Sequence, residues 1–275
     1  MINKKPQVSA IVPVFNEEKR VRKVIGTLLK SRLISEIICI NDGSTDKSLS
    51  ILKKFGQKIN LINFKENQGK GTAVAAGIKK ASGDYLLFCD SDLINFTTSH
   101  VKSMIEPISR RESSVVLAVP TQDQTGKYGK HEVYLAGERV YPRKVLLPYL
   151  SKLTRTKGAG GSEIVLNTLF PKKAVTVVPL IGLYKPFKVS KWSSTMALKQ
   201  YLFSIVGVLQ ESGRIEINSI RDLKQLENLI QVDTFEGLIE KIDEIKNKKI
   251  RSLLEKYFLK YISKYAKNFK LGKFI

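Results

Sequence analysis

The pattern of hydrophobic and polar residues in the first half of the chain alternates short apolar runs with stretches of helical spacing. The apolar runs predict β-strands at Val8–Phe15, Glu36–Asn41, Ile59–Phe64 and Asp84–Cys89. The segments between them predict helices at Glu17–Leu29, Asp46–Phe55 and Gly71–Ala81. Alternation of strands and helices is typical of a mainly parallel sheet with helices on both faces. The sequence therefore predicts an α/β fold.

The second half of the chain has a less regular pattern. It predicts strands at Val115–Val119 and Val175–Leu180, a loop at Gln122–Lys130, and helices at Arg143–Leu153, Ser162–Leu169 and beyond Trp192. We expect one domain over residues 1–211, with halves 1–112 and 113–211. A helical, basic extension is expected over residues 212–275.

Polar residues cluster where the predicted strands end. The clusters are Asn16-Glu17, Asn41-Asp42, Glu66-Asn67 and Asp90-Ser91-Asp92. In open parallel sheets, ligands bind beyond the carboxyl ends of the strands. We therefore predict an active site along this edge of the sheet.

The segment Asp90-Ser91-Asp92 predicts a metal site. Two carboxylates one residue apart at a strand end can share a divalent cation, and Mg²⁺ completes its shell with diphosphate oxygens and water. Such an ion offsets the charge on a departing nucleotide diphosphate. Acidic pairs are also common in surface loops, so the position after a strand is what favours a metal. We expect Mg²⁺ or Mn²⁺ to be held by Asp92 and Asp90.

Two further clusters predict contacts to a nucleotide. Asp42 ends a strand, where its carboxylate can accept from the imide N–H of uracil or the corresponding edge of guanine; turn formation and helix capping by residues 43–46 are the alternative. The loop Glu66–Thr72 is similar to a phosphate-binding loop without the full P-loop spacing. Asn67 and Lys70 are the residues of that loop expected to contact the base, ribose or phosphate.

These segments together resemble the family 2 glycosyltransferases, which have the GT-A fold. The resemblance covers residues 7–97 and rests on Val8–Glu18, Asn41–Ser48, Asn67–Gly71 and Ser82–Leu93, in the same order and spacing. It implies that Asp42 faces the base, Asp90 lies near the ribose or diphosphate, and Asp92 binds Mg²⁺ or Mn²⁺. The nucleotide-sugar site that it implies consists of Pro13, Phe15, Glu17, Asp42, Asn67, Lys70, Asp90 and Ser91. Within the family, Asp90–Asn95 is similar to glucosyl-3-phosphoglycerate synthases, and polyprenyl-phosphate sugar transferases match the remainder equally well.

The acceptor half carries two weaker similarities to the same relatives. Gly137–Arg143 resembles a segment that lines their acceptor side, and Gly158–Asn167 resembles one that places Glu163 near the sugar. Glu163 is expected to be a catalytic base or a ligand of a sugar hydroxyl; a solvated glutamate at a helix N-terminus is the alternative. The cations expected to neutralise an acceptor phosphate are Lys127, Lys130, Arg139 and Arg143.

One departure from the relatives concerns the metal. Some of them have a metal-binding His after the strand that corresponds to Val175–Leu180, whereas residues 182–187 here contain none. The two histidines of the chain, His100 and His131, do not match that position. Metal binding is therefore expected to fall to the carboxylates and the diphosphate.

The net charge of +22 favours a polyanionic partner, although a generally basic host proteome is an alternative. The last thirty residues carry ten Lys or Arg and one acidic residue. An apolar face at helical spacing accompanies them, formed by Ile250, Leu253, Leu254, Tyr257, Phe258, Tyr261, Ile262, Tyr265 and Phe269. Such a helix can lie in a membrane interface or pack on its own domain. We expect a cytoplasmic protein, with peripheral contact to the inner face of the membrane as an open alternative.

The function that these patterns favour is metal-dependent transfer of a hexosyl group from a UDP- or GDP-sugar to a lipid-linked acceptor, with polyprenyl phosphate as the leading candidate. An acceptor phosphate is already anionic and needs no strong base. A soluble phosphorylated or sugar acceptor is the second candidate, and a nucleotidyltransferase is a further one. A basic nucleic-acid-binding protein is the alternative of another class, but no reading motif accompanies the charge, so no nucleic-acid partner is expected.

Overall fold

The computed structural model describes residues 6–121, 124–128, 133, 136–156, 161–167, 169–170, 174–185, 202, 206, 228–229 and 235–259. Internal contacts divide the chain into two compact units, Met1–Pro186 and Phe187–Ile275, each of which is considered by itself. The domain boundary predicted at residues 211/212 lies outside the described residues and stays a prediction.

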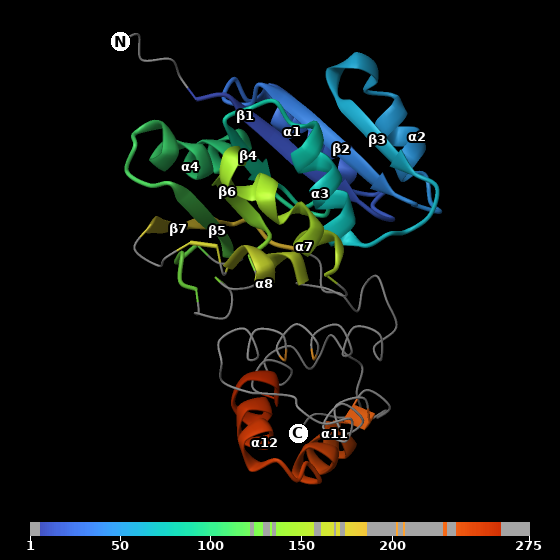
Figure 1. The fold of residues 1–275 in the computed structure, drawn as a ribbon, viewed down its shortest axis with the longest axis vertical. Coiled ribbons are helices and arrows are strands. Elements are labelled where there is room, and N and C mark those ends of the chain that lie inside the picture. The colour runs from blue at the N-terminus through green and yellow to red at the C-terminus, as the bar shows by residue number, and fades with distance from the viewer. Residues whose placement is uncertain are drawn as a thin grey trace. The chain divides into compact units, whose positions relative to one another are not determined.

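The first unit is built on a seven-stranded sheet in the order β3-β2-β1-β4-β6-β5-β7 (Figure 1). All neighbouring strands run parallel except β6, which is antiparallel to both β4 and β5. The carboxyl ends of the other six strands therefore meet at one edge. The strands are β1 (Val8–Val14), β2 (Glu36–Asp42), β3 (Asn60–Phe64), β4 (Tyr85–Phe88), β5 (Val115–Thr121), β6 (Glu138–Pro142) and β7 (Val175–Ile181).

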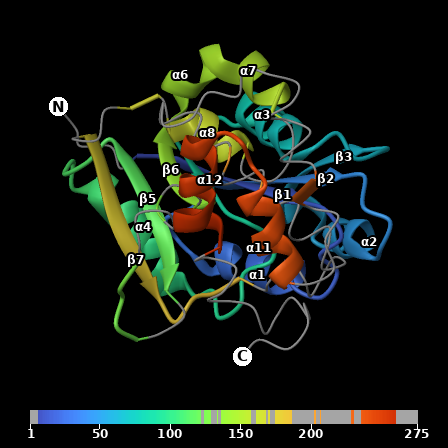
Figure 2. The same cartoon turned by 90° about the horizontal axis from the view of Figure 1, so that it is seen from below.

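Helices cover both faces of this sheet, and a separate apolar core lies on each face (Figure 2). One core includes the apolar stripe of α1 (Val21–Lys30) and residues of α4 (Thr98–Ser109), and α2 (Ser48–Lys53) packs beside α1. The other core includes α3 (Lys70–Lys80). It also takes in α6 (Arg143–Leu146), the short η2 (Leu147–Tyr149), α7 (Leu150–Thr154) and α8 (Gly161–Asn167).

The structure confirms the predicted α/β fold and adds two elements that the pattern analysis missed. Helix α4 begins at a reciprocal cap, in which His100 N donates to Thr97 Oγ1 and Thr97 N donates to His100 Nδ1. A cap of this kind satisfies two backbone donors at the helix start. The hydrophobic pattern does not predict strand β6, because the strand begins with the charged pair Glu138 and Arg139, and both are fully buried. Buried charges at a strand start do not follow the apolar pattern that predicts strands.

The loops after β1 and β2 are tied to one another at the carboxyl edge. Asn16 Oδ1 accepts from Thr45 N at 2.8 Å, and Asn16 N donates to Ser44 Oγ at 3.1 Å. Glu17 N donates to Ser48 Oγ at 2.8 Å. These bonds give residues 44–48 a structural role that is independent of any ligand. Cys39 and Cys89 are both free and buried in the strand region.

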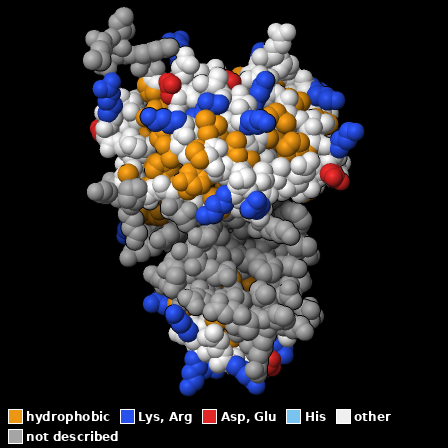
Figure 3. All heavy atoms as spheres, viewed as in Figure 1, with side chains coloured by type: hydrophobic (Ala, Val, Ile, Leu, Met, Phe, Trp, Pro, Cys, Tyr) orange, Lys and Arg blue, Asp and Glu red, His pale blue; other side chains and the backbone are white. Residues whose placement is uncertain are grey.

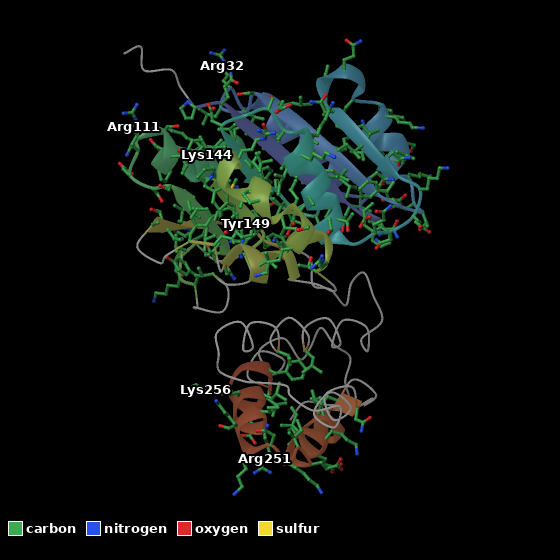
Figure 4. All side chains as sticks on the ribbon, in the orientation of Figure 1. Arg32, Arg111, Lys144, Tyr149, Arg251 and Lys256 are labelled. Atoms are coloured by element: carbon green, nitrogen blue, oxygen red, sulfur yellow. The ribbon has the colours of Figure 1, made fainter. Side chains whose placement is uncertain are left out.

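The described part of the second unit consists mainly of α11 (Phe235–Asp243), α12 (Lys248–Leu254) and the π-helical η6 (Glu255–Leu259). Three of the apolar side chains predicted there, Ile250, Leu254 and Phe258, are at most 2% exposed, and Leu253 is half-buried. Arg251 and Lys256 extend outward from these helices (Figure 4). Over residues 248–259 the structure therefore favours packing of the apolar face over its insertion into a membrane. No helix among the described residues is long and apolar enough to cross a membrane.

Gly43 gives the first testable prediction. Its φ is +68°, and a Cβ there would lie 2.2 Å from the backbone carbonyl carbon of Glu66. Gly43→Ala should therefore lower the free energy of unfolding by more than about 2 kcal/mol, from left-handed strain and displacement of the next loop. Gly26→Ala is the matched control. A Cβ at Gly26 meets nothing within 4 Å inside α1, so that change should stabilise the protein by about 0.5–1 kcal/mol. Urea denaturation of both variants measures the difference, and equal stabilities would contradict the prediction.

Candidate functional site

The candidate site is centred on Asp90, which follows β4 at the carboxyl edge of the sheet. Its Oδ1 accepts from Lys70 Nζ at 2.7 Å, and Lys70 is the first residue of α3. The same ammonium donates to Glu163 Oε1 at 2.6 Å, and Glu163 lies in the first turn of α8. Lys70 thus joins a carboxylate of the predicted donor half to one of the predicted acceptor half.

A second lysine completes this network from the other side. Lys185 Nζ lies 2.5 Å from Asp90 Oδ2 and 2.9 Å from Glu138 Oε2. Lys185 follows β7, and Glu138 begins β6, so the two partners come from distant parts of the chain. The result is an alternating chain of charges, which we call the ion-pair chain: Glu138, Lys185, Asp90, Lys70 and Glu163.

Gly137 allows this close packing. A Cβ at that position would lie 2.5 Å from Asp90 Oδ2 and 3.0 Å from Lys185 Nζ. Any side chain there would push apart the carboxylate and the ammonium that pair beside it. The glycine before β6 is therefore part of the construction of the site.

The members of the ion-pair chain differ in burial, and their pKa values shift accordingly. The side chain of Glu138 is 0% exposed, and burial raises its pKa to about 7 against the opposing ammonium of Lys185. Burial also opposes ionisation of Glu163, but the ammonium of Lys70 outweighs it and lowers the pKa of this carboxyl to about 2. For Asp90, Lys185 and Lys70 outweigh burial and hold the pKa well below its usual range. Asp90 and Glu163 are thus ionised at neutral pH.

Arg139 links the elements that carry the site. Its side chain is buried, and its guanidinium donates to Ala136 O at 2.5 Å, to Tyr141 Oη at 3.0 Å and to Asn167 Oδ1 at 2.8 Å. These bonds connect β6 with α8, the helix that carries Glu163. Charge-assisted hydrogen bonds of this kind are about twice as strong as neutral ones. Arg139 therefore fixes the helix that presents the carboxylate.

Asp42 is buried at the end of β2 and organises the neighbouring loop. Its Oδ1 accepts from Gln68 N at 2.8 Å, and its Oδ2 accepts from Gly69 N at 3.1 Å. Burial raises the pKa of Asp42, and the two backbone donors oppose that shift. Asp42 thereby holds the loop that ends in Lys70, while Asn67 on the same loop is exposed. Each carboxylate oxygen has a second lone pair for another donor.

The remaining predicted donor residues differ in whether they line the pocket beside Asp90. A pocket brings together residues of both predicted halves of the domain, and Pro13 lies in its wall. The pocket is lined by Pro13, Lys70, Val74, Phe88, Cys89, Asp90, Gly137, Arg139, Ser162, Glu163 and Leu166. Ser91 is buried and Asp92 half-buried in the segment after β4, whereas Phe15 and Glu17 follow β1 outside the lining. Glu17 is buried and forms an ion pair with Arg20 at 3.5 Å.

The predicted acceptor cations are not gathered in one place. Arg139 is buried, and it belongs to the site only as one of the residues that line the pocket. Arg143 N donates to Asp84 O, just before the start of β4, so Arg143 lies at the opposite edge of the sheet from Asp90. Lys127 is exposed in a loop where Gly126 lies beside Ile181, at the carboxyl end of β7. Lys130 lies outside the described residues.

The carboxylates fit a divalent ion only in part. Among the described residues, no group of three or more His, Cys, Asp or Glu side chains is arranged to hold a metal. Asp92 lies two residues beyond Asp90, and both oxygens of Asp90 already accept from an ammonium. Two carboxylates supply two of the six ligands that Mg²⁺ requires. The side chains therefore fit an ion that takes its remaining ligands from a bound diphosphate and water.

Sequence reasoning missed two residues of the ion-pair chain. Glu138 lies within the segment Gly137–Arg143, and Lys185 lies within residues 182–187, but the sequence predicts no role for either side chain. Glu138 precedes an Arg at a strand start, and Lys185 follows Gly182-Leu183-Tyr184 after a strand. A polar residue at the carboxyl end of a strand was the available signal for Lys185. No comparable signal existed for Glu138, because it lies at the amino end of an antiparallel strand.

Comparisons with known proteins identify the family of the chain. The model of the family described as glycosyl transferase family 2 matches residues 9–170, which is more than half of the chain. An uncharacterized glycosyltransferase of Haemophilus influenzae is 38% identical over 91 residues, covering 32% of this chain and 36% of that protein. The dolichyl-phosphate beta-glucosyltransferase ALG5D of Trichomonas vaginalis is 35% identical over 102 residues, covering 32% of this chain and 31% of that protein. In the first relatives, the chain spans about a third to a half of their length.

Solved structures show the same fold. Glucosyl-3-phosphoglycerate synthase from Mycobacterium tuberculosis, in complex with Mn²⁺, UDP-glucose and phosphoglyceric acid, superposes with a TM-score of 0.59. The sequence identity is 21%, and the match covers 77% of this chain and 81% of that chain. A complex of the same synthase with Mg²⁺ and UDP gives a TM-score of 0.58. This similarity confirms the predicted GT-A architecture.

The opposite pKa shifts of Glu138 and Glu163 give a prediction about stability and pH. Glutamate titrates near pH 4.3 in unfolded chains. Because the pKa of Glu138 is raised to about 7, its contribution is full below about pH 4.3 and is lost as the pH rises to about 7. The stability of the wild type relative to Glu138→Gln should therefore fall by on the order of 1–3 kcal/mol between pH 5 and pH 7.5. Urea denaturation in EDTA measures this difference.

Glu163→Gln is the control for that experiment. The pKa of Glu163 is lowered to about 2, so its contribution is present above about pH 4.3 and is lost as the pH falls toward 2. The wild type and Glu163→Gln should therefore differ by a constant amount between pH 5 and pH 7.5. A constant difference for Glu138→Gln as well would show that its carboxyl is not perturbed.

Proposed function

The chain belongs to glycosyl transferase family 2, and on this basis we propose that it transfers a hexosyl group from a UDP- or GDP-sugar to a lipid-linked acceptor, with polyprenyl phosphate as the leading candidate. The observation that carries the proposal is the pair of ammonium groups, Lys70 and Lys185, on either side of Asp90 at the carboxyl edge of the sheet. They supply positive charge where a GT-A protein would hold the diphosphate of its donor.

The two ammonium groups have a direct use in the reaction. A departing nucleoside diphosphate gains negative charge, and preorganised positive groups in a partly buried site stabilise that charge. The side chains of Lys70 and Lys185 are 33% and 27% exposed. Lys70 lines the pocket, and Lys185 is paired with Asp90, which also lines it. Mg²⁺ or Mn²⁺, held by Asp92 and Asp90 together with the diphosphate, would add Lewis-acid neutralisation of the same leaving group.

The nucleotide end of the donor has a proposed place beside Asp42. Asp42 fixes the loop of residues 67–70 through two backbone donors and keeps lone pairs for a base N–H. Asn67 is exposed on that loop, and Pro13 lies in the wall of the adjacent pocket. The base would therefore lie toward β1 and β2, and the sugar toward α8.

Glu163 has a proposed role that follows from its low pKa. A carboxyl whose pKa is about 2 is a weak base at neutral pH, but it accepts hydrogen bonds well. Its Oε1 accepts from Lys70 and its Oε2 from Ser162 Oγ at 2.8 Å. We therefore assign Glu163 to binding a donor sugar hydroxyl. A weak base at this position fits an acceptor whose phosphate oxygen is already ionised.

Two observations bear on the acceptor. The dolichyl-phosphate beta-glucosyltransferase among the relatives is named for a lipid phosphate acceptor, which supports the leading candidate. The synthase of similar fold was crystallised with phosphoglyceric acid, which supports a soluble phosphorylated acceptor as the second candidate. Both are phosphates, and among the predicted acceptor cations we propose exposed Lys127, near the carboxyl end of β7, as the one that approaches the acceptor.

A lipid-linked acceptor would require the protein to approach a membrane from the cytoplasm. Lysine and arginine side chains are spread over the described surface seen in Figure 3, and acidic side chains there are few. Each basic residue near an anionic membrane contributes on the order of 1 kcal/mol. Because the apolar face of α12 is buried, we propose a peripheral contact that is electrostatic and weakened by salt.

Donor binding can be tested by thermal shift with a panel of nucleotide-sugars. We expect one UDP- or GDP-sugar to raise the Tm in the presence of Mn²⁺. Asp92→Ala should reduce this shift by about half, because it removes one of the two carboxylate ligands of the ion while the ammonium groups of Lys70 and Lys185 remain. Glu112→Ala removes an exposed carboxylate outside the site and should leave the shift intact. Equal shifts for the wild type and Asp92→Ala would contradict the assignment of the metal site.

The acceptor can be tested by following a radiolabelled sugar from the identified donor. Reactions with polyprenyl phosphate in liposomes should move the label into the organic phase, whereas a soluble phosphate acceptor would leave it in the aqueous phase. Rates with anionic liposomes should fall severalfold between low and high salt, because the proposed contact is electrostatic. Transfer to 3-phosphoglycerate alone would replace the leading candidate with the second.

A further inference from the structure

Lys185 is a member of the ion-pair chain that none of the sequence motifs singles out. Its ammonium lies between Asp90 Oδ2 and Glu138 Oε2, at 2.5 Å and 2.9 Å. Lys70 occupies the other oxygen of the same carboxylate at 2.7 Å. The carboxylate best placed to bind a divalent ion after β4 is therefore already paired with cations on both oxygens.

We infer that the Lys185 ammonium competes with the divalent ion for Asp90 and acts as an internal cation of the diphosphate site, which gives this protein a weakened metal requirement. The competition for Asp90 stands on the geometry of the described residues. Only the part that concerns the diphosphate rests on the proposed function.

The surroundings of Lys185 fit such a role better than an ordinary surface ion pair. Glu138 is fully buried and forms an ion pair with Lys185, so a buried carboxylate holds the ammonium in place. A side chain at position 137 would collide with both the ammonium and Asp90, and Gly137 avoids this collision. The side chain of Lys185 is nonetheless 27% exposed, and its ammonium lies 2.5 Å from Asp90, which lines the pocket.

The charges of the site lead to the same inference. A divalent ion at Asp90 would lie within a few ångströms of an ammonium, and like charges at that separation repel strongly when they are partly buried. A diphosphate relieves the repulsion, because it brings at least two negative charges that both cations can share. The protein alone should therefore bind Mn²⁺ weakly. A nucleoside diphosphate should bind measurably even when no metal is present.

The experiment measures Mn²⁺ binding to the full chain without nucleotide, by the EPR signal of the free ion. Lys185→Met should bind Mn²⁺ at least tenfold more tightly than the wild type, because it removes the competing cation. A second measurement uses UDP and GDP in EDTA by calorimetry. In EDTA, Lys185→Met should bind the nucleotide at least tenfold more weakly than the wild type. Added Mn²⁺ should reduce this difference in nucleotide affinity between the two proteins.

Two further variants make the result specific. Lys185→Met combined with Glu138→Gln leaves the net charge of the protein unchanged and no buried carboxylate unpaired, and it should show the same tighter binding of Mn²⁺. Lys79→Met removes an exposed lysine of α3 outside the site, and its affinities for Mn²⁺ and for the nucleotide should equal those of the wild type.

The inference is overturned if both Lys185 variants bind Mn²⁺ within twofold of the wild type, or if Lys79→Met tightens binding equally. If neither UDP nor GDP binds the wild type with or without Mn²⁺, the proposed function fails. The metal titration then still decides whether Lys185 competes for Asp90.

Discussion

The candidate site depends on one electrostatic constraint, which is that three carboxylates at the edge of a sheet share two ammonium groups. Glu138 is fully buried, and Asp90 and Glu163 are largely so. Buried charges are tolerated only when they are paired, and removing one partner of such a pair costs about 3–5 kcal/mol. The loops and helices that carry these side chains are therefore held in register by the same charges that would meet a ligand.

The ion-pair chain also joins the two halves of the predicted domain. Asp90 and Lys70 come from the half that carries the donor motifs, while Glu138, Glu163 and Lys185 come from the other half. Arg139 extends the connection inward by bonding β6 to α8. The pocket is thus complete only when β6, β7 and α8 have packed against β4 and α3. Under the proposed function, donor binding would therefore depend on the fold of the acceptor half.

The cations of the site neutralise the protein's own carboxylates. A diphosphate that enters the pocket would exchange these partners for its own oxygens, so the charge balance is kept while the contacts change. Catalytic geometry often tightens only in the bound state. The pairing of Lys70 and Lys185 with Asp90 is therefore compatible with both ammonium groups contacting a donor later.

The sequence by itself determined the α/β fold of the first half, and it predicted a site along the carboxyl edge of the sheet. Apolar runs and helical spacing are local signals, and polar clusters at strand ends mark the ligand-binding edge of a parallel sheet. Asp42, Lys70 and Asp90 could be singled out for that reason. Only the tertiary structure revealed β6 as a central antiparallel strand, placed Arg143 at the opposite edge and paired Lys185 with Asp90, 95 residues away. Ion pairs between distant residues leave no periodic pattern, because they are decided by which strands lie side by side.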